Sequence, residues 1–112
     1  ELFDEGRGVR DYTFVDDAVE ALLRLAAADD SYLLINVGSQ HPVATLDVVD
    51  LLERALERPA ERRLLPAQAG DVAATYADIT RAQETLGWEP RVPFEIGIAR
   101  FCSWLLSEAS AG

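Results

Sequence analysis

The sequence contains no lysine and no methionine, and it has only one cysteine and one histidine. With Cys102 alone, no disulfide can form within the chain, and no cysteine–histidine cluster has the spacing of a zinc site. This use of cysteine fits a reducing, cytoplasmic compartment. Because a translation product begins with methionine, its absence predicts that these 112 residues are a fragment of a longer protein.

Long hydrophobic runs are also missing, and this excludes a transmembrane span and a signal peptide within the sequence. The formal net charge is −10, and all ten basic residues are arginine. A chain this acidic repels nucleic acid and anionic membranes, so neither is expected as a partner. A small phosphate ligand held by one or two local arginines remains compatible with this charge.

Apolar periodicity predicts about four helices joined by short strands and loops, which is the pattern of an α/β protein. Aspartates and threonines at helix starts favour N-caps, and glycine or proline marks the helix ends. The first helix is expected to be capped by Asp16 or Asp17 and to end at Asp29-Asp30, and the second to be capped by Thr45. The third is expected to be capped by Asp78 and to end at Gly87, and the fourth to start at Pro93.

Extended segments are predicted at residues 1–3, 9–15, 62–65 and 74–76. The strongest strand signal is the nearly continuous apolar run at residues 32–37, which ends at a glycine. Such a run is typical of a strand buried on both faces of a parallel sheet. Since the chain has few other strand candidates, this strand is expected to join a sheet that other sequence completes.

No catalytic constellation stands out. His41 precedes a proline in an expected loop and has no nucleophile arranged around it, which favours a solvated loop histidine. The Asp16-Asp17 pair has the pattern of a metal or acid–base site, but a helix cap with a first-turn acid explains it without further function. Cys102 lies on the apolar face of a helix, which favours a core thiol. No glycine-rich phosphate loop joins a strand to a helix.

Arg10 has two interpretations. A guanidinium is a fork-shaped donor suited to phosphate, so Arg10 is a candidate ligand contact. Alternatively, it forms a local ion pair with the adjacent Asp11, and such exposed pairs contribute little to stability. Residues 68–71 (Gln-Ala-Gly-Asp) predict a turn that offers an amide and a carboxylate to the hydroxyls of a ligand.

Four segments, in order, resemble the C-terminal part of extended short-chain dehydrogenase/reductase enzymes that act on nucleotide sugars. Within that superfamily, the pattern Gln-x-Gly-Asp-Val-x-Ala-Thr-Tyr-Ala-Asp is most similar to UDP-glucuronate 4-epimerases. The ordered set is specific, and it covers nearly the whole chain. The segments are residues 10–17 (Arg-Asp-Tyr-Thr-Phe-Val-Asp-Asp), 36–38 (Asn-Val-Gly), 70–78 and 86–90 (Leu-Gly-Trp-Glu-Pro).

The resemblance implies a substrate site. Arg10 would contact the diphosphate of a UDP-sugar, and Asp71 would hydrogen-bond its ribose. Gln68, at a position where the UDP-galactose type more often has arginine, would lie nearby in the same pocket. Residues 1–112 would form the C-terminal substrate-binding domain, and the remaining motifs would be scaffold.

The resemblance also shows what the chain lacks. The dinucleotide fingerprint and the catalytic Tyr-x-x-x-Lys of the family belong to its N-terminal half, and this chain has no lysine. The fragment is therefore expected to bind no NAD and to be inactive alone, whereas the parent would be an NAD-dependent epimerase. Alternatives are a dehydratase, decarboxylase or reductase of the same superfamily, and a non-catalytic binding or assembly module.

The expected partners are a UDP-sugar and the N-terminal Rossmann half. Without that half, the faces of the helix containing Asp17 and of the strand at 33–37 should be partly exposed or covered by self-association, for example in a homodimer.

Overall fold

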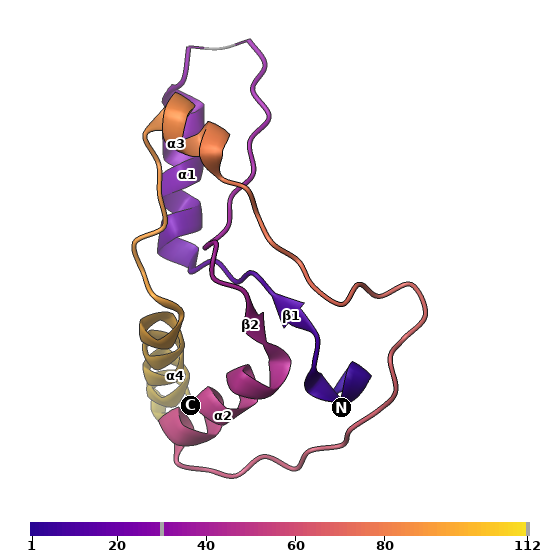
Figure 1. The fold of residues 1–112 in the computed structure, drawn as a ribbon. Coiled ribbons are helices and arrows are strands. Elements are labelled where there is room, and N and C mark those ends of the chain that lie inside the picture. Colours follow the sequence, from indigo (N-terminus) through magenta and orange to yellow (C-terminus); the bar gives the residue numbers. More distant parts are fainter. Residues whose placement is uncertain (30, 112) are drawn as a thin grey trace.

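A computed structural model describes residues 1–29 and 31–111. In Figure 1, α1 and α3 lie together at one end of the molecule, α2 and α4 lie at the other, and long extended segments join the two ends. The mixed α/β arrangement with four helices and short strands confirms the fold class expected from the sequence. The elements in chain order are the 3₁₀ helix η1 (Phe3–Gly6), β1 (Val9–Arg10), α1 (Val15–Ala27), β2 (Val43–Ala44), α2 (Thr45–Leu56), α3 (Thr80–Leu86) and α4 (Phe94–Ala111).

The main core lies between α1 and α3. Trp88, two residues after the end of α3, is 1% exposed and packs with Ala21 of α1 and with Ile79 and Ala82. Gly87 ends α3 in the left-handed conformation (φ +62°), as the sequence predicted, because glycine adopts this conformation without steric strain. The end expected at Asp29-Asp30 falls just after α1, and Asp30 lies outside the described residues.

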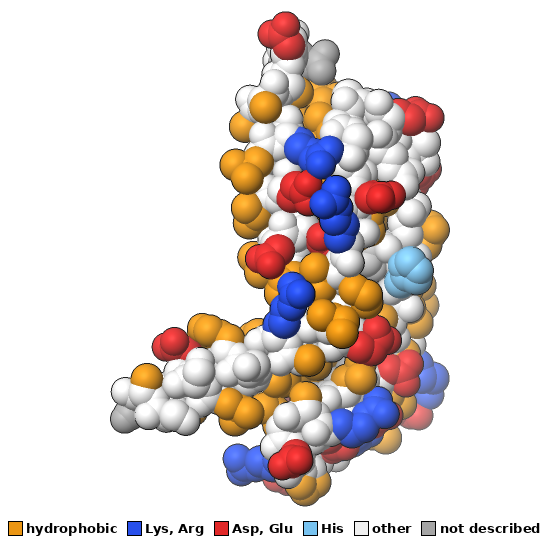
Figure 2. Space-filling model, turned by 90° about the vertical axis from the view of Figure 1, so that its left-hand side faces the viewer, with side chains coloured by type: hydrophobic (Ala, Val, Ile, Leu, Met, Phe, Trp, Pro, Cys, Tyr) orange, Lys and Arg blue, Asp and Glu red, His pale blue; other side chains and the backbone are white. Residues whose placement is uncertain are grey.

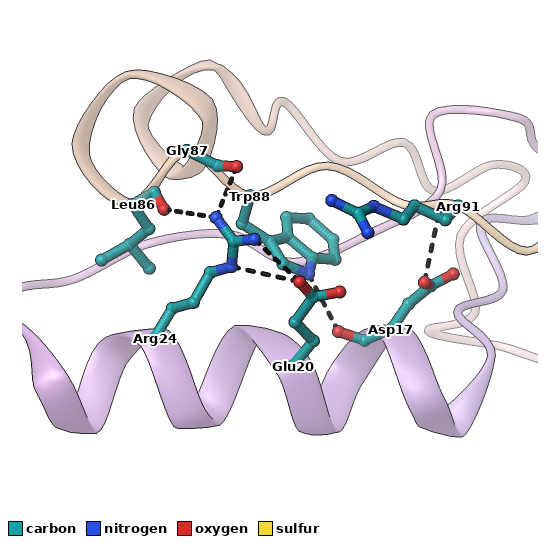
Figure 3. A network of polar contacts seen from close by, with 7 residues as sticks. All are labelled: Asp17, Glu20, Arg24, Leu86, Gly87, Trp88 and Arg91. Carbon is teal, nitrogen blue, oxygen red and sulfur yellow. Dashed lines mark hydrogen bonds and ion pairs between the residues drawn. The ribbon is translucent and has the colours of Figure 1, made fainter.

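A polar network ties the start of α1 to the chain that follows α3 (Figure 3). The Asp17 carboxylate is buried and accepts hydrogen bonds from the backbone N–H groups of Arg91 and Val92 at 3.1 and 3.0 Å. Trp88 Nε1 donates to the Asp17 carbonyl oxygen at 2.9 Å. At the other end of α1, Arg24 donates to the Leu86 and Gly87 carbonyl oxygens at the end of α3 and pairs with Glu20.

The helix starts differ from the predicted caps. The prediction that Asp16 or Asp17 caps α1 is wrong, because the helix begins earlier, at Val15, and the Asp17 carboxylate is used by the network after α3. Thr45 is the first residue of α2 rather than its cap, and its hydroxyl donates to the Gly8 carbonyl oxygen at 3.0 Å. Helix α4 begins one residue after Pro93. Asp78 lies one residue before the N-cap of α3 and accepts from the Thr80 N–H at 3.0 Å.

Most predicted strands are shorter than expected. β1 and β2 form a two-stranded antiparallel sheet with Val9 opposite Ala44. Residues 1–3 and 62–65 contribute only an isolated parallel bridge between Leu2 and Leu64, and η1 replaces the first expected strand. Residues 32–37 are extended but pair with no strand in the part of the chain that the structure describes. These residues therefore form no strand within this chain, since a strand needs a neighbour, and the pairing with a sheet completed by other sequence stays a prediction.

Helix α1 leaves much of its apolar surface uncovered. The side that faces α3 and Trp88 carries the buried Ala21, whereas Val19, Leu22 and Leu23 of the predicted apolar face are exposed. Hydrophobic side chains gather along one edge of the molecule in Figure 2. The total accessible surface is 7897 Å², against about 6,100 Å² expected for a compact protein of this mass. The exposure predicted for this helix and for residues 33–37 is thus confirmed.

Helices α2 and α4 pack against each other at the opposite end of the molecule. Gly97 of α4 is buried against the Phe14 ring, and a Cβ there would lie 3.0 Å from a ring carbon. Cys102 is 2% exposed, so it is the core thiol that the sequence predicted.

Candidate functional site

The structure brings together Arg10 and Asp71, two of the three residues expected to contact substrate. Arg10 Nη2 donates to Asp71 Oδ1 at 2.7 Å, although the residues are 61 positions apart in sequence. Arg10 Nη1 donates to the Val9 carbonyl oxygen at 2.8 Å, which holds the guanidinium against its own strand. The pair is reachable from solvent, with Arg10 28% and Asp71 47% exposed. The alternative of a local Arg10–Asp11 ion pair is wrong.

Backbone pairing explains why these two residues meet. β1 lies between β2 on one side and residues 73–75 on the other. Val9 N–H donates to the Ala73 carbonyl oxygen at 2.9 Å, and Thr75 N–H donates to the Val9 carbonyl oxygen at 3.0 Å. This parallel bridge sets the register between the two segments, so Asp71 lies beside Arg10.

Asp71 is positioned by a tight turn. The Asp71 N–H donates to the Gln68 carbonyl oxygen at 3.2 Å, and Gly70 has φ +85°. A positive φ at the third position of a turn requires glycine or asparagine, so the turn predicted for residues 68–71 is confirmed together with its reason. The Val72 N–H then donates to Asp71 Oδ1 at 2.9 Å.

Asp11 clamps three segments together behind this pair. Its carboxylate accepts hydrogen bonds from the N–H and hydroxyl of Ser39, from the Gln40 N–H at 3.1 Å and from the Ala77 N–H at 3.1 Å. Its own N–H donates to Thr75 Oγ1 at 3.3 Å. Burial by itself would raise the pKa of the Asp11 carboxyl, but the hydrogen bonds from Ser39, Ala77 and Gln40 outweigh burial and lower it.

Gly38 makes this clamp sterically feasible. It is buried, and a Cβ at this position would collide with the Ala77 Cβ and lie 2.8 Å from Asp11 Oδ2. Only a residue without a side chain lets the backbone after residues 32–37 pass so close to Asp11 and Ala77. The glycine of the Asn-Val-Gly segment therefore has a packing role next to the site.

A cavity of about 280 Å³ opens beside the Arg10–Asp71 pair. This volume lies near the lower end of the range of about 300–1,000 Å³ typical of small-molecule pockets. Thr45 at the start of α2 closes one side, and the chain before and after Asp71 closes another. The lining residues are Glu1, Leu2, Phe3, Asp4, Gly8, Arg10, Thr45, Ala67, Asp71, Val72 and Ala73.

Gln68 does not line this cavity. Its side chain is exposed, and its backbone carbonyl supports the turn that carries Asp71. His41 is exposed with Nδ1 2.8 Å from the Ser39 carbonyl oxygen, as expected of a loop histidine. Within residues 1–29 and 31–111, no group of three histidine, cysteine, aspartate or glutamate side chains could hold a metal ion.

Sequence reasoning missed Asp11 as the organiser of the site. The available signal was its place directly after Arg10, together with a glycine at position 38 that ends an extended run. Neither signal shows that three distant segments meet at one carboxylate. That contact depends on the path of the chain between residues 11 and 77.

A larger cavity, of about 810 Å³, lies elsewhere, between residues 32–36 and α3. Its one basic side chain, Arg81, donates to the Leu34 carbonyl oxygen at 3.0 Å. This hollow runs along an extended segment that lacks a strand neighbour among the described residues, so its shape fits a polypeptide surface better than a small anionic ligand. The smaller cavity at Arg10 is therefore the better candidate for a ligand site.

Comparison with known proteins identifies the class. The sequence model of a family described as GDP-mannose 4,6 dehydratase matches residues 2–101. The chain therefore belongs to the nucleotide-sugar epimerases and dehydratases of the extended short-chain dehydrogenase/reductase superfamily.

Two of the similar proteins described next are named as sugar-nucleotide epimerases. A probable UDP-glucuronate 4-epimerase of Rhizobium meliloti is 32% identical over 93% of this chain and 36% of its own length. A crystal structure of UDP-glucose 4-epimerase from Thermotoga maritima with UDP-glucose matches 96% of this chain and 35% of that protein, with a TM-score of 0.87 and 31% identity. MoeE5, solved with UDP-glucuronic acid and NAD, matches 96% of this chain and 36% of its own, with a TM-score of 0.89 and 29% identity.

The chain thus spans about a third of the length of these relatives. Within the described residues, no helix has the length and apolar character needed to cross a membrane.

Proposed function

We propose that this chain is the nucleotide-sugar-binding portion of an NAD-dependent sugar-nucleotide epimerase, similar to UDP-glucuronate 4-epimerase, and that Arg10 binds the diphosphate while Asp71 binds the ribose. The observation that carries the proposal is the meeting of Arg10 and Asp71 at one cavity. A guanidinium offers paired N–H donors to phosphate oxygens, and a carboxylate accepts hydrogen bonds from hydroxyl groups. Gln68, in the turn before Asp71, is proposed as a further contact from the rim of the cavity.

Three of the matched structures, of two proteins, support the ligand class. The Thermotoga maritima epimerase was solved with UDP-glucose, and MoeE5 was solved with UDP-glucuronic acid and with UDP-glucose. All of these ligands share the UDP group, whereas their sugars differ. Arg10 and Asp71 are accordingly assigned to the UDP group, and the choice of sugar is assigned to residues outside this chain.

The proposal predicts that Arg10→Ala weakens UDP binding by about tenfold to a hundredfold, the loss expected for a charge-assisted hydrogen bond of about 1.5–3 kcal/mol. Isothermal titration of UDP into the chain and into the variant measures this. Arg58→Ala is the matched control, because Arg58 is an exposed arginine after α2 and does not line the cavity. Equal UDP affinity in the original chain and in Arg10→Ala would reject the phosphate role.

The residues of this chain do not fit NAD. The sequence has no glycine-rich turn between a strand and a helix, and it has no lysine for a Tyr-x-x-x-Lys pair. The catalytic pair and the cofactor site are therefore assigned to another part of the protein, and this chain is proposed to have no epimerase activity alone. No step of the reaction is assigned to its residues.

The same proposal gives a role to the uncovered surface of α1 and residues 32–37. We propose that this surface packs against the Rossmann half of the parent enzyme, as a strand and helix added to its sheet. Three features support this: the exposed leucines of α1, the extended segment without a strand neighbour among the described residues, and the large total surface. The parent protein is expected to be a cytoplasmic enzyme that contains both halves.

When the chain is isolated, this surface is expected to drive self-association. Light scattering at high concentration should give a mass above 12.3 kDa that falls on dilution. Leu23→Glu on α1 should reduce the association, and Leu106→Glu, an equally drastic change on the exposed part of α4, should not. A constant monomer mass, or equal effects of the two variants, would contradict the assignment of the α1 surface.

A further inference from the structure

In this structure the phosphate donor of the proposed site already has an anionic partner from its own chain. Arg10 Nη2 donates to Asp71 Oδ1 at 2.7 Å, and Nη1 is held by the Val9 carbonyl oxygen at 2.8 Å. Each Nη nitrogen therefore uses one of its two N–H donors within the chain. An anion that approaches Nη2 has to compete with the Asp71 carboxylate for that edge of Arg10.

Asp71 has unused acceptor capacity on the same carboxylate. Oδ1 accepts from Arg10 and from the Val72 N–H, whereas Oδ2 accepts no hydrogen bond within residues 1–29 and 31–111. The Gly70 turn holds the residue at the cavity edge with its side chain 47% exposed. A carboxylate in this state is ready to accept hydrogen bonds from ligand hydroxyls.

The Arg10–Asp71 pair itself disfavours plain anions. Glu1 and Asp4 also line the cavity, but they pair with Arg63 at 3.6 Å and with Arg7 at 2.8 Å, so Asp71 is the carboxylate that an anion meets at Arg10. Inorganic phosphate or pyrophosphate would have to break the Arg10–Asp71 pair and then lie beside an uncompensated carboxylate. A nucleoside diphosphate meets the same Arg10, but its ribose hydroxyls donate to the carboxylate that its phosphate displaces.

We propose that Asp71 determines the specificity of the site by masking Arg10 from ligands that carry phosphate without ribose. This inference rests on the proposed nucleotide-binding function and adds to it. The masking ion pair and the ribose contact use the same carboxylate, so a ligand needs both groups to replace what it breaks. The selectivity arises from competition for Arg10 as well as from the contact with ribose.

Asp71→Asn separates the two effects, because the amide keeps the shape but removes the charge that pairs with Arg10. Isothermal titration with inorganic pyrophosphate and with UDP should show opposite changes. Pyrophosphate is expected to bind about twofold to fivefold more tightly, since an exposed ion pair of up to about 1 kcal/mol no longer opposes it. UDP is expected to bind about tenfold more weakly, since a charged hydrogen-bond acceptor is lost.

Asp47→Asn is the matched control. It removes the same charge from the first turn of α2, close to the cavity residue Thr45, without touching Arg10. Its ratio of UDP to pyrophosphate affinity should equal that of the original chain. Circular dichroism confirms that each variant is folded, and Asp71→Ala gives a second measurement of the same ratio.

The outcomes distinguish the inference from the proposed function. If the original chain binds UDP through Arg10 but Asp71→Asn leaves pyrophosphate affinity unchanged or lower, the masking role is rejected while nucleotide binding stands. If Asp47→Asn raises pyrophosphate affinity as much as Asp71→Asn does, the change in the net charge of the chain explains the effect. The masking role is then also rejected. If the original chain binds no UDP, both proposals fail together.

Discussion

Replacing Trp88 by alanine is expected to lower the free energy of unfolding by about 3–5 kcal/mol, the usual cost of removing a large buried aromatic side chain. Trp88 is 1% exposed and is the largest residue of the small core between α1 and α3. Its Nε1 also donates to the Asp17 carbonyl oxygen, so the variant loses a buried hydrogen bond as well as packing (Figure 3). Because the core has few other members, the remaining side chains cannot close the cavity.

Urea denaturation followed by circular dichroism measures this change. Trp104→Ala is the matched control, because Trp104 lies on α4 with 55% of its surface exposed and its only aromatic neighbour among the described residues is Phe101. The control should change stability by about 1 kcal/mol or less. If the two tryptophan variants lose the same stability, the α1–α3 core does not dominate the fold.

Asp11→Asn is expected to cost about 1–3 kcal/mol at pH 7, because an amide replaces a carboxylate that accepts hydrogen bonds from three residues. The amide nitrogen would face N–H donors that it cannot accept from. The segments that carry Arg10, Ser39 and Ala77 would then separate. UDP affinity is expected to fall with stability, since the bridge that sets Arg10 beside Asp71 loses its anchor.

The sign of the pH dependence follows from the lowered pKa of the Asp11 carboxyl. A carboxyl with a lower pKa in the folded protein than its ordinary value of 3.8 stabilises the fold above that value. This contribution is lost as the pH falls from about 3.8 through the folded pKa. The stability difference between the original chain and Asp11→Asn should therefore be largest near neutral pH and should shrink in acid.

Denaturation curves at pH 7 and at pH 3 measure this difference. The pKa values of Glu53 and Asp78 are also lowered, mainly by hydrogen bonds from Arg62 and Thr80, so the variant keeps part of the acid sensitivity. Asp16→Asn is the control, because Asp16 is exposed and its contact is a 3.9 Å pair with Arg100. If the stability difference between the original chain and Asp11→Asn stays constant with pH, the role assigned to the Asp11 charge is contradicted.

Local signals in the sequence predicted the helices well. All four starts of the described helices lie within two residues of the predicted positions, and the Gly87 end of α3 and the Gly70 turn are confirmed. These features depend on residues a few positions apart. Backbone preferences of glycine and proline act in any tertiary context, so they can be interpreted without knowing the fold.

Strands and buried faces were predicted less well. The run at residues 32–37 has the composition of a buried strand, but no neighbour among the described residues completes its hydrogen bonds. The apolar stripe of α1 is exposed, as predicted for a chain without its N-terminal half, but the sequence did not show that Ala21 and Asp17 would face the core instead. A strand or an apolar face depends on what lies beside it, and residues close in sequence do not contain that information.

The sequence by itself determined the family, the four helices and the choice of Arg10, Gln68 and Asp71 as candidate ligand contacts. Only the tertiary structure decided that Arg10 pairs with Asp71 across 61 positions, that Asp11 joins three segments behind them, and that Gln68 lies outside the cavity. The physical reason is the distance in sequence between the residues that make each contact. Turns and helices form from contacts a few residues apart, whereas the site depends on a parallel bridge between β1 and residues 73–75 that no local pattern specifies.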